Sequence, residues 1–180
     1  MDDVTAAKIM ISSLDLTSLN ETDRPEDIKR LCARAVTPYG KAAAVCVYPQ
    51  FIPLVLQNLS DNIRIATVVN FPAGGTDMTT VAKSIKKALK SGADEIDAVF
   101  PYHSFLDGEY DLCREFLNML RDETGENTLK VIIESGELAT VGNIRGVTQM
   151  CIEQGADFIK TSTGKTKIAA TPEAANVILE

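Results

Sequence analysis

The stretch "EQGADFIKTSTGK" (153–165) leads from the end of a helical pattern, through a glycine turn, into a short apolar strand. Glycine often ends a helix, and short apolar runs that stop at polar residues are typical of buried strands. The phrase "KSGADEIDAVF" (90–100) has the same order of helix end, Gly-Ala-Asp and strand. The chain therefore repeats either a whole βα unit or one way of making the turn.

Four further apolar runs rich in Val and Ile bring the number of predicted strands to six. The six runs span 13–17, 42–49, 63–72, 95–101, 129–136 and 158–164. Amphipathic patterns between them predict helices at 23–36, 77–93, 109–122, 141–156 and 171–180. Because strands alternate with helices and no linker divides the chain, we predict a single α/β domain with a parallel sheet over residues 1–180.

Polar residues inside the strands decide between two parallel-sheet architectures. A doubly wound nucleotide-binding sheet usually has a glycine-rich first βα turn, and "SLNETDRPED" (18–27) has no glycine. In a (β/α)8 barrel, side chains from several strands converge inside, and the carboxyl ends of the strands form the active site. We therefore predict a TIM (β/α)8-type barrel with only about six βα units in this chain. The strand residues concerned are Asp15, Cys46, Asp97, Lys130 and Lys160.

The composition excludes several classes of function. A net charge of −7 argues against nucleic-acid or membrane-surface partners, which require an excess of basic residues. No apolar run approaches the roughly 20 residues that cross a bilayer. The acidic start "MDDVTAAKIM" (1–10) lacks the layout of a signal peptide. We therefore expect a cytoplasmic protein.

The cysteines and the histidine do not indicate a metal site. The four cysteines are far apart in the sequence, without a CxxC pair, and His103 is the single histidine. A zinc site would find few ligands in this set, so we expect free thiols in a reducing compartment. We assign His103 to a loop without a role, and we expect Cys46 to be a small packed apolar residue.

Lys160 is the residue whose sequence context points most specifically to a chemical role. A desolvated lysine near a second cation has a lowered pKa, which leaves a free amine to attack a carbonyl and form a Schiff base. A lysine in an apolar strand can equally extend its side chain to the strand end, where the ammonium meets water. Lys130 in the preceding strand can supply the second cation, but the pattern alone favours a residue that opens its strand at the lower rim of the barrel.

Two aspartates and one turn complete the candidates. Asp97 and Asp15 lie in apolar strands, where each can act as an acid or base or can pair with a lysine. Backbone N–H groups of "TSTGK" (161–165), with Lys165 beside them, suit a phosphate. The pattern alone favours an ordinary strand-ending turn, because the GxxxxGK[ST] spacing of a P-loop is absent. The segment "FPAGGTD" (71–77) is interpreted as a loop before a helix.

Taken in order, the strand motifs resemble those of the deoxyribose-phosphate aldolases, which are class I aldolases on a TIM barrel. The motifs are "LDLTSLN", "AAVCVYPQFIP", "IRIATVVNFPAG", "GADEIDAVFPY", "LKVIIESGEL" and "GADFIKTSTGK", and the resemblance runs from about residue 13 to residue 180. It implies a lyase that reversibly cleaves 2-deoxy-D-ribose 5-phosphate to acetaldehyde and D-glyceraldehyde 3-phosphate, in deoxyribose phosphate catabolism. It also implies that no metal or organic cofactor is needed.

The resemblance assigns roles to individual residues. It makes Lys160 the lysine that forms the Schiff base, Asp97 the group that takes part in proton transfer, and Lys130 a neighbour in the same site. The residues that match the substrate pocket are Asp15, Thr17, Cys46 and Thr163, while Gly164 and Lys165 match part of the phosphate site.

The chain departs from the family pattern at its end. A "GFKPAGGVR"-like strand and a "GASS"-like strand have no counterpart, and a barrel of this type takes about 250 residues. We therefore expect that the last two βα units are lacking. In the family, these units carry a lysine that lowers the pKa of the Schiff-base lysine, and most of the residues that bind the phosphate. The alternatives are a truncated, catalytically weak or inactive aldolase fragment and a non-catalytic phosphate-binding barrel. Open strand edges predict a homo-oligomer, a dimer or higher.

Overall fold

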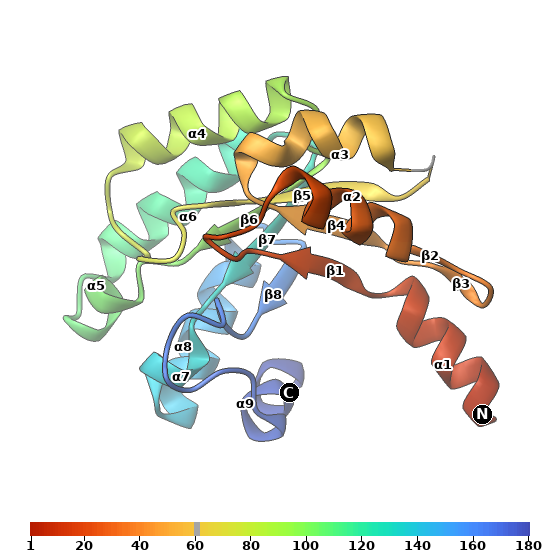
Figure 1. Ribbon diagram of the computed structural model, residues 1–180. Helices are drawn as coiled ribbons and strands as arrows, with labels where there is room; N and C mark the ends of the chain where they lie inside the picture. The colour runs from red at the N-terminus through yellow and green to blue at the C-terminus, as the bar shows by residue number, and fades with distance from the viewer. Residues whose placement is uncertain (60–61) are drawn as a thin grey trace. The chain divides into compact units, whose positions relative to one another are not determined.

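The computed structural model describes residues 1–59 and 62–180 and has the alternating α/β order that the sequence predicts (Figure 1). The strand order in the sheet is β1-β4-β5-β6-β7-β8. The strands are β1 (Asp15–Ser18), β4 (Ala44–Val47), β5 (Arg64–Val69), β6 (Glu95–Val99), β7 (Thr128–Ile132) and β8 (Phe158–Lys160). The predicted fold class, an α/β fold of the TIM-barrel type with six strands, is confirmed.

One helix precedes β1, and the others follow strands along the chain. The helices are α1 (Asp3–Ser12), α2 (Pro25–Arg34), α3 (Ile52–Asn58), α4 (Met78–Lys90), α5 (Tyr102–Leu106), α6 (Tyr110–Thr124), α7 (Ser135–Leu138), α8 (Val141–Glu153) and α9 (Pro172–Leu179). A 3-10 turn covers Pro49–Phe51, and a small hairpin joins β2 (Val36–Thr37) to β3 (Gly40–Lys41). Among the helices that the structure describes, none has the length and apolar composition needed to cross a membrane.

The five predicted helices are all present, but the sequence patterns do not predict α1, α3, α5, α7 or the hairpin. The helices α5 and α7 have only five and four residues, too few for a periodic pattern. Pro53 stands in the first turn of α3, where a proline is tolerated, although in a sequence it resembles a helix breaker. The assignment of His103 to a loop is wrong, because the residue lies in α5.

The chain divides into two compact units, Met1–Val68 with Lys87–Glu95 and Val69–Lys86 with Ile96–Glu180. In the first unit, β1, β4 and β5 pair in parallel, with Thr17 opposite Cys46 and Cys46 opposite Ala66. All four residues of β4 are buried, which explains why the strand has a continuous apolar sequence without alternation. The buried hydroxyl of Thr67 donates to the Val47 carbonyl over 2.8 Å, so this polar group is satisfied inside the core.

The two Gly-Ala-Asp phrases build the same turn, once in each unit. The Asp94 carboxylate accepts a hydrogen bond from the Ile65 N–H over 2.8 Å, and the Asp157 carboxylate accepts one from the Leu129 N–H over 2.8 Å. In both turns the N–H of the aspartate donates to the carbonyl of that same strand residue, over 2.8 and 2.9 Å. The glycine of each phrase has a positive φ, 103° and 79°, in the region that favours glycine. The repeated phrase is therefore one turn device used twice.

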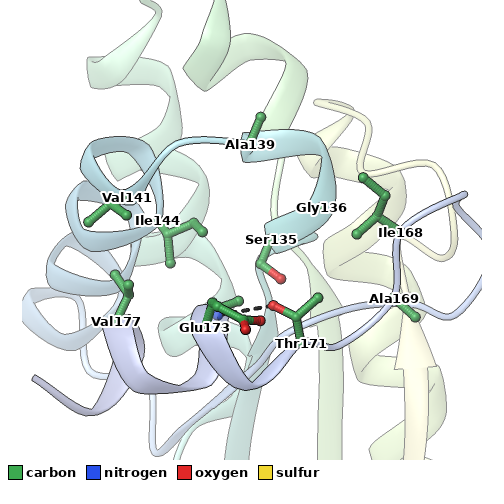
Figure 2. A pocket seen from close by; sticks show the side chains of 11 residues that line it. Ser135, Gly136, Ala139, Val141, Ile144, Ile168, Ala169, Thr171, Glu173 and Val177 are labelled. Carbon is green, nitrogen blue, oxygen red and sulfur yellow. Dashed lines mark hydrogen bonds between the residues drawn. The ribbon is translucent and has the colours of Figure 1, made fainter.

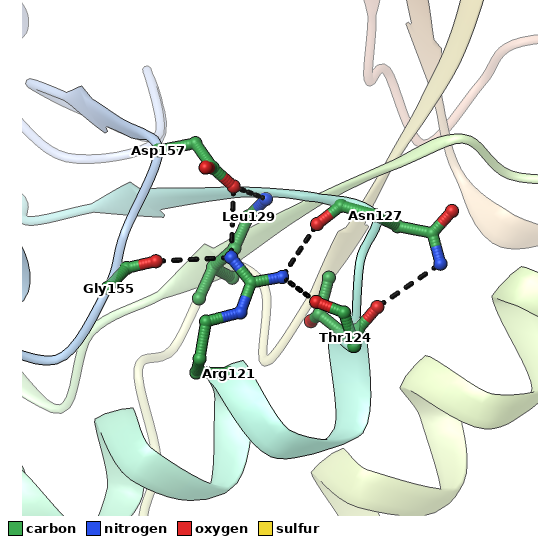
Figure 3. A network of polar contacts seen from close by, with 7 residues as sticks. Arg121, Thr124, Asn127, Leu129, Gly155 and Asp157 are labelled. Atoms are coloured by element: carbon green, nitrogen blue, oxygen red, sulfur yellow. Dashed lines mark hydrogen bonds and ion pairs between the residues drawn. The ribbon is translucent and has the colours of Figure 1, made fainter.

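Arg121, in the last turn of α6, ties together the segments that lead into β7 and β8 (Figure 3). Its guanidinium donates to the Asp157 carboxylate over 2.9 Å, to the Gly155 carbonyl over 3.1 Å and to the Asn127 carbonyl over 2.6 Å. It also donates to the Gly125 carbonyl. A guanidinium offers five donors in a rigid fork, so one side chain satisfies acceptors from two separate segments.

We expect Arg121→Ala to lower the free energy of unfolding by about 1.5–3 kcal/mol, because several acceptors lose a charged donor together. The matched control is Arg114→Ala, in the same helix, whose partner Asp111 has a side chain that is 99% exposed. We expect the control to change the free energy of unfolding by less than about 0.5 kcal/mol. Urea denaturation followed by circular dichroism measures both, and equal losses in the two variants would contradict the role of Arg121.

Candidate active site

Three charged side chains from three strands meet in the second unit: Asp97 of β6, Lys130 of β7 and Lys160 of β8. Lys130 Nζ lies 3.7 Å from Asp97 Oδ1, and Lys160 Nζ pairs with Asp97 Oδ2. In the register of the two strands, Lys130 is opposite Phe158 and Lys160 is opposite Ile132. Because residues two apart on a strand share a face, both lysines project from one face, with Lys160 nearer the carboxyl ends.

Burial separates the two lysines. The side chain of Asp97 is 0% exposed, that of Lys130 is 5% exposed and that of Lys160 is 27% exposed. The interpretation that Lys130 opens its strand at the rim is wrong, because β7 begins at Thr128 and Lys130 is buried in its middle. Of the two amines, that of Lys160 is therefore the one that a carbonyl compound can reach.

The charges in this cluster depend on one another. A fully buried carboxylate is unfavourable unless cations stand beside it, and two ammonium groups repel unless an anion lies between them. Asp97 meets both conditions, because each of its oxygens faces a different lysine. The same carboxylate holds the Lys160 amine in position and lies within reach to exchange protons with it.

The turn after β8 is held by a carboxylate that the sequence patterns do not single out. Glu134 is 0% exposed, and its Oε2 accepts a hydrogen bond from Thr163 Oγ1 over 2.5 Å. Its Oε1 accepts one from Thr166 Oγ1 over 3.2 Å, and both oxygens lie 3.3 Å from Thr163 N. One signal was available in the sequence: Glu134 is a charged residue directly after the apolar run "VII" (131–133).

The predicted phosphate residues lie in the same turn, with Thr163 Oγ1 accepting from the Lys165 N–H over 3.0 Å. Gly164 has a φ of 73°, and no heavy atom lies within 4 Å of the place that a Cβ would take. Gly164 and Lys165 are both exposed. The backbone of the turn is therefore open to an anion at Gly164.

The remaining predicted residues, Asp15, Thr17 and Cys46, belong to the first unit. Asp15 and Thr17 are two residues apart on β1 and so share a face, and Thr17 is opposite Cys46 in the register. Thr17 Oγ1 donates to the Asp15 carbonyl over 3.0 Å. Cys46 is 0% exposed, as expected of a packed apolar residue.

Metal and thiol chemistry have little support in the described parts of the chain. There, no group of three or more His, Cys, Asp or Glu side chains is placed to hold a metal ion. The four cysteines are buried free thiols. Burial raises the pKa of the Cys113 thiol to about 11 and also raises that of Cys151, so neither is a ready nucleophile at neutral pH.

A cavity of about 250 Å³ lies in the second unit, beside the turn that follows β7 (Figure 2). Most of its wall is apolar and includes Val141 and Ile144 of α8 and Ala174 and Val177 of α9. Ser135, at the start of α7, and Ile168, in the segment after β8, also line it. The charged cluster does not line this cavity.

Comparisons with known proteins agree with the motifs and confirm the resemblance. A family model described as DeoC/LacD family aldolase matches residues 9–180. QR15, described as an aldolase, is 29% identical with a TM-score of 0.87, and the match covers 99% of this chain and 76% of that chain. A protein of Coccidioides immitis, provisionally described as a deoxyribose-phosphate aldolase, is 28% identical with a TM-score of 0.87, covering 94% of this chain and 67% of that chain. The deoxyribose phosphate aldolase of Aeropyrum pernix shares the fold at 21% identity with a TM-score of 0.78, covering 95% and 71%.

We expect Asp97→Ala to lower the free energy of unfolding by about 3–5 kcal/mol, because it removes the carboxylate that Lys130 pairs with in the interior. Asp122→Ala, at an exposed position of α6, is the control and should change it by less than about 0.5 kcal/mol. In the double variant Asp97→Leu with Lys130→Met, both partners become apolar and part of the loss should return. Guanidinium chloride titration measures all three, and a double variant less stable than Asp97→Ala would contradict the pairing.

Proposed function

Because the chain belongs to the DeoC/LacD family of aldolases, we propose that it is a class I aldolase for 2-deoxy-D-ribose 5-phosphate. In this proposal it cleaves the sugar phosphate reversibly to acetaldehyde and D-glyceraldehyde 3-phosphate, through a Schiff base on Lys160. Asp97 takes part in proton transfer, and Lys130 is the second cation beside it. No metal or organic cofactor enters the reaction.

The observation that supports the proposal most is the pairing of the partly exposed Lys160 amine with the buried Asp97 carboxylate. A Schiff-base enzyme needs a lysine that reaches a carbonyl and an acid–base group within hydrogen-bonding distance of it. Lys130 adds a buried cation on the other oxygen of the same carboxylate. The combination is chemically more specific than a lone lysine at a strand end.

The proposed reaction begins when the uncharged Lys160 amine attacks the aldehyde carbon of the open-chain sugar and water leaves to give a protonated imine. The imine accepts the electron pair of the C2–C3 bond as that bond breaks. At the same time the C3 hydroxyl gives up its proton and becomes the aldehyde of D-glyceraldehyde 3-phosphate. The resulting enamine takes up a proton at C2, and water releases acetaldehyde from Lys160. Asp97 is the proposed proton carrier of these steps.

The phosphate of the substrate is proposed to bind at the turn after β8, through the open backbone at Gly164 and the ammonium of Lys165. The other proposed pocket residues are Asp15, Thr17, Cys46 and Thr163. A homo-oligomer and a cytoplasmic location stay predictions. A tetrameric structure is described for the Aeropyrum pernix aldolase, which shares the fold.

We expect acetaldehyde and sodium borohydride to leave an N-ethyl group on Lys160, because the imine is reduced before it can hydrolyse. Peptide mass spectrometry locates the group, and Lys160→Ala should abolish it. Lys167→Ala is the matched control, since Lys167 is a nearby exposed lysine without a proposed role. Equal labelling of Lys160 and Lys167 in the unaltered chain would contradict the special reactivity of Lys160.

Turnover of the sugar phosphate tests the role of Asp97 separately. We expect Asp97→Asn to lower kcat by about 10²- to 10⁴-fold, the usual contribution of a positioned acid–base group. A coupled assay of D-glyceraldehyde 3-phosphate measures the rate. An unchanged kcat would remove Asp97 from the proton transfer. Labelling of Lys160 without any turnover would favour the alternative of an inactive aldolase fragment.

A further inference from the structure

We propose that Glu134 is a positioning residue that shapes the turn after β8 into a phosphate site, and that it acts through Thr163. The inference rests on the function proposed above, whose substrate carries a phosphate. It changes the role of Thr163 from a side chain that contacts the substrate to a link between Glu134 and the backbone of Lys165.

The polar groups of Thr163 are already engaged inside the turn. Its hydroxyl donates to Glu134 Oε2 over 2.5 Å and accepts from the Lys165 N–H over 3.0 Å. Its own N–H points at the Glu134 carboxylate, 3.3 Å from either oxygen. A hydroxyl has a single hydrogen to donate, so these contacts use every donor that Thr163 possesses. The hydrogen bonds therefore form a relay from Glu134 through Thr163 to the backbone of Lys165.

Glu134 is itself fixed by its backbone. It has a φ of 52° and a ψ of 59°, a left-handed conformation that a side-chain-bearing residue rarely adopts. The next residue, Ser135, donates its N–H to the Thr161 carbonyl over 2.7 Å. A Cβ at Gly136 would stand only 2.4 Å from the Ile168 carbonyl oxygen, so the two segments meet backbone to backbone (Figure 2). The turn after β7 thus packs directly against the segment that follows β8.

Because the Glu134 carboxylate is buried, its hydrogen bonds restrict the turn after β8 to one conformation. The donors to Glu134 within the described residues are one N–H and two hydroxyls, all uncharged. A buried carboxylate held by neutral donors needs all of them, because losing any one leaves a buried charge with less compensation. These donor groups, on the inner side of the turn, are therefore engaged in hydrogen bonds to Glu134. Gly164 and Lys165 are exposed, and they are the residues that we propose an incoming anion meets.

The geometry also dictates which substitutions report on this role. Both oxygens of Glu134 lie 3.3 Å from Thr163 N, so in Glu134→Gln either orientation of the amide sets its NH₂ group against the Thr163 N–H. Thr163→Val keeps the shape of the side chain and removes the hydroxyl. Thr163→Ser keeps the hydroxyl. Glu134→Gln and Thr163→Val are thus the two relay-breaking variants: the first leaves one acceptor oxygen for three donors, and the second removes the linking hydroxyl. Thr163→Ser preserves the relay.

The experiment measures the binding of inorganic phosphate by the unaltered chain and by Glu134→Gln, Thr163→Val and Thr163→Ser. Thr79→Val, at an exposed position of α4, is the matched Thr-to-Val control. Phosphate is titrated while the amide NMR signals of Gly164 and Lys165 are followed. We expect the two relay-breaking variants to weaken binding about tenfold or more. We expect Thr163→Ser and Thr79→Val to stay within about twofold of the unaltered chain.

Borohydride trapping of acetaldehyde on Lys160 is measured in parallel, because acetaldehyde carries no phosphate. We expect trapping to change by less than about threefold in Glu134→Gln and Thr79→Val, which a general loss of structure would not allow. Phosphate binding that is absent in the unaltered chain, or unchanged in both relay-breaking variants, would overturn the proposal. A proportional loss of trapping and phosphate binding would overturn it as well.

The two proposals fail in different ways. If the unaltered chain binds phosphate but does not trap acetaldehyde, the proposed catalysis is lost and the positioning role of Glu134 stands. If Glu134→Gln does not fold, the comparison of Thr163→Val with Thr163→Ser decides the question alone.

Discussion

The buried carboxylate of Asp97 is the constraint on which the arrangement of the second unit depends. Its burial is tolerable because cations stand beside it, and these come from β7 and β8. The register of the two strands must therefore keep Lys130 and Lys160 on one face. A slip by one residue would turn a strand's side chains to the opposite face, so the alignment that stabilises the interior also aligns the candidate chemistry.

Glu134 is buried as well, and the donors to it in the described part of the chain are uncharged. Its partners are hydroxyls and a backbone N–H from the turn after β8, and it gives that turn a single shape. Two acids on separate segments thus hold neighbouring parts of one short stretch of chain. Asp97 holds the amine of Lys160, and Glu134 holds the turn that begins directly after it. In the proposed function, Asp97 supports the cleavage of the carbon–carbon bond and Glu134 separately supports the binding of the phosphate.

The sequence could predict the six strands because runs rich in Val and Ile, stopped by Gly, Pro or polar residues, are visible without coordinates. The charges of Lys160 and Asp97 were visible for the opposite reason, as polar residues inside apolar runs. The sequence allows Asp97 to pair with a lysine but does not say with which one, because that depends on the register between strands. Glu134 also adjoins an apolar run, but Ser and Gly follow it, so its sequence context is that of a loop residue. Only its burial distinguishes it, and burial is a property of the folded chain.

The two Gly-Ala-Asp turns anchor Ile65 and Leu129, each the second residue of its strand. Strands anchored at their amino ends keep their alignment whatever happens in the loops at their carboxyl ends, which is where barrels of this type carry their function. Such loops can accept insertions and substitutions without disturbing the sheet. Residues at the carboxyl end of a strand can therefore change during the evolution of new substrate specificities, while the anchored amino end maintains the fold.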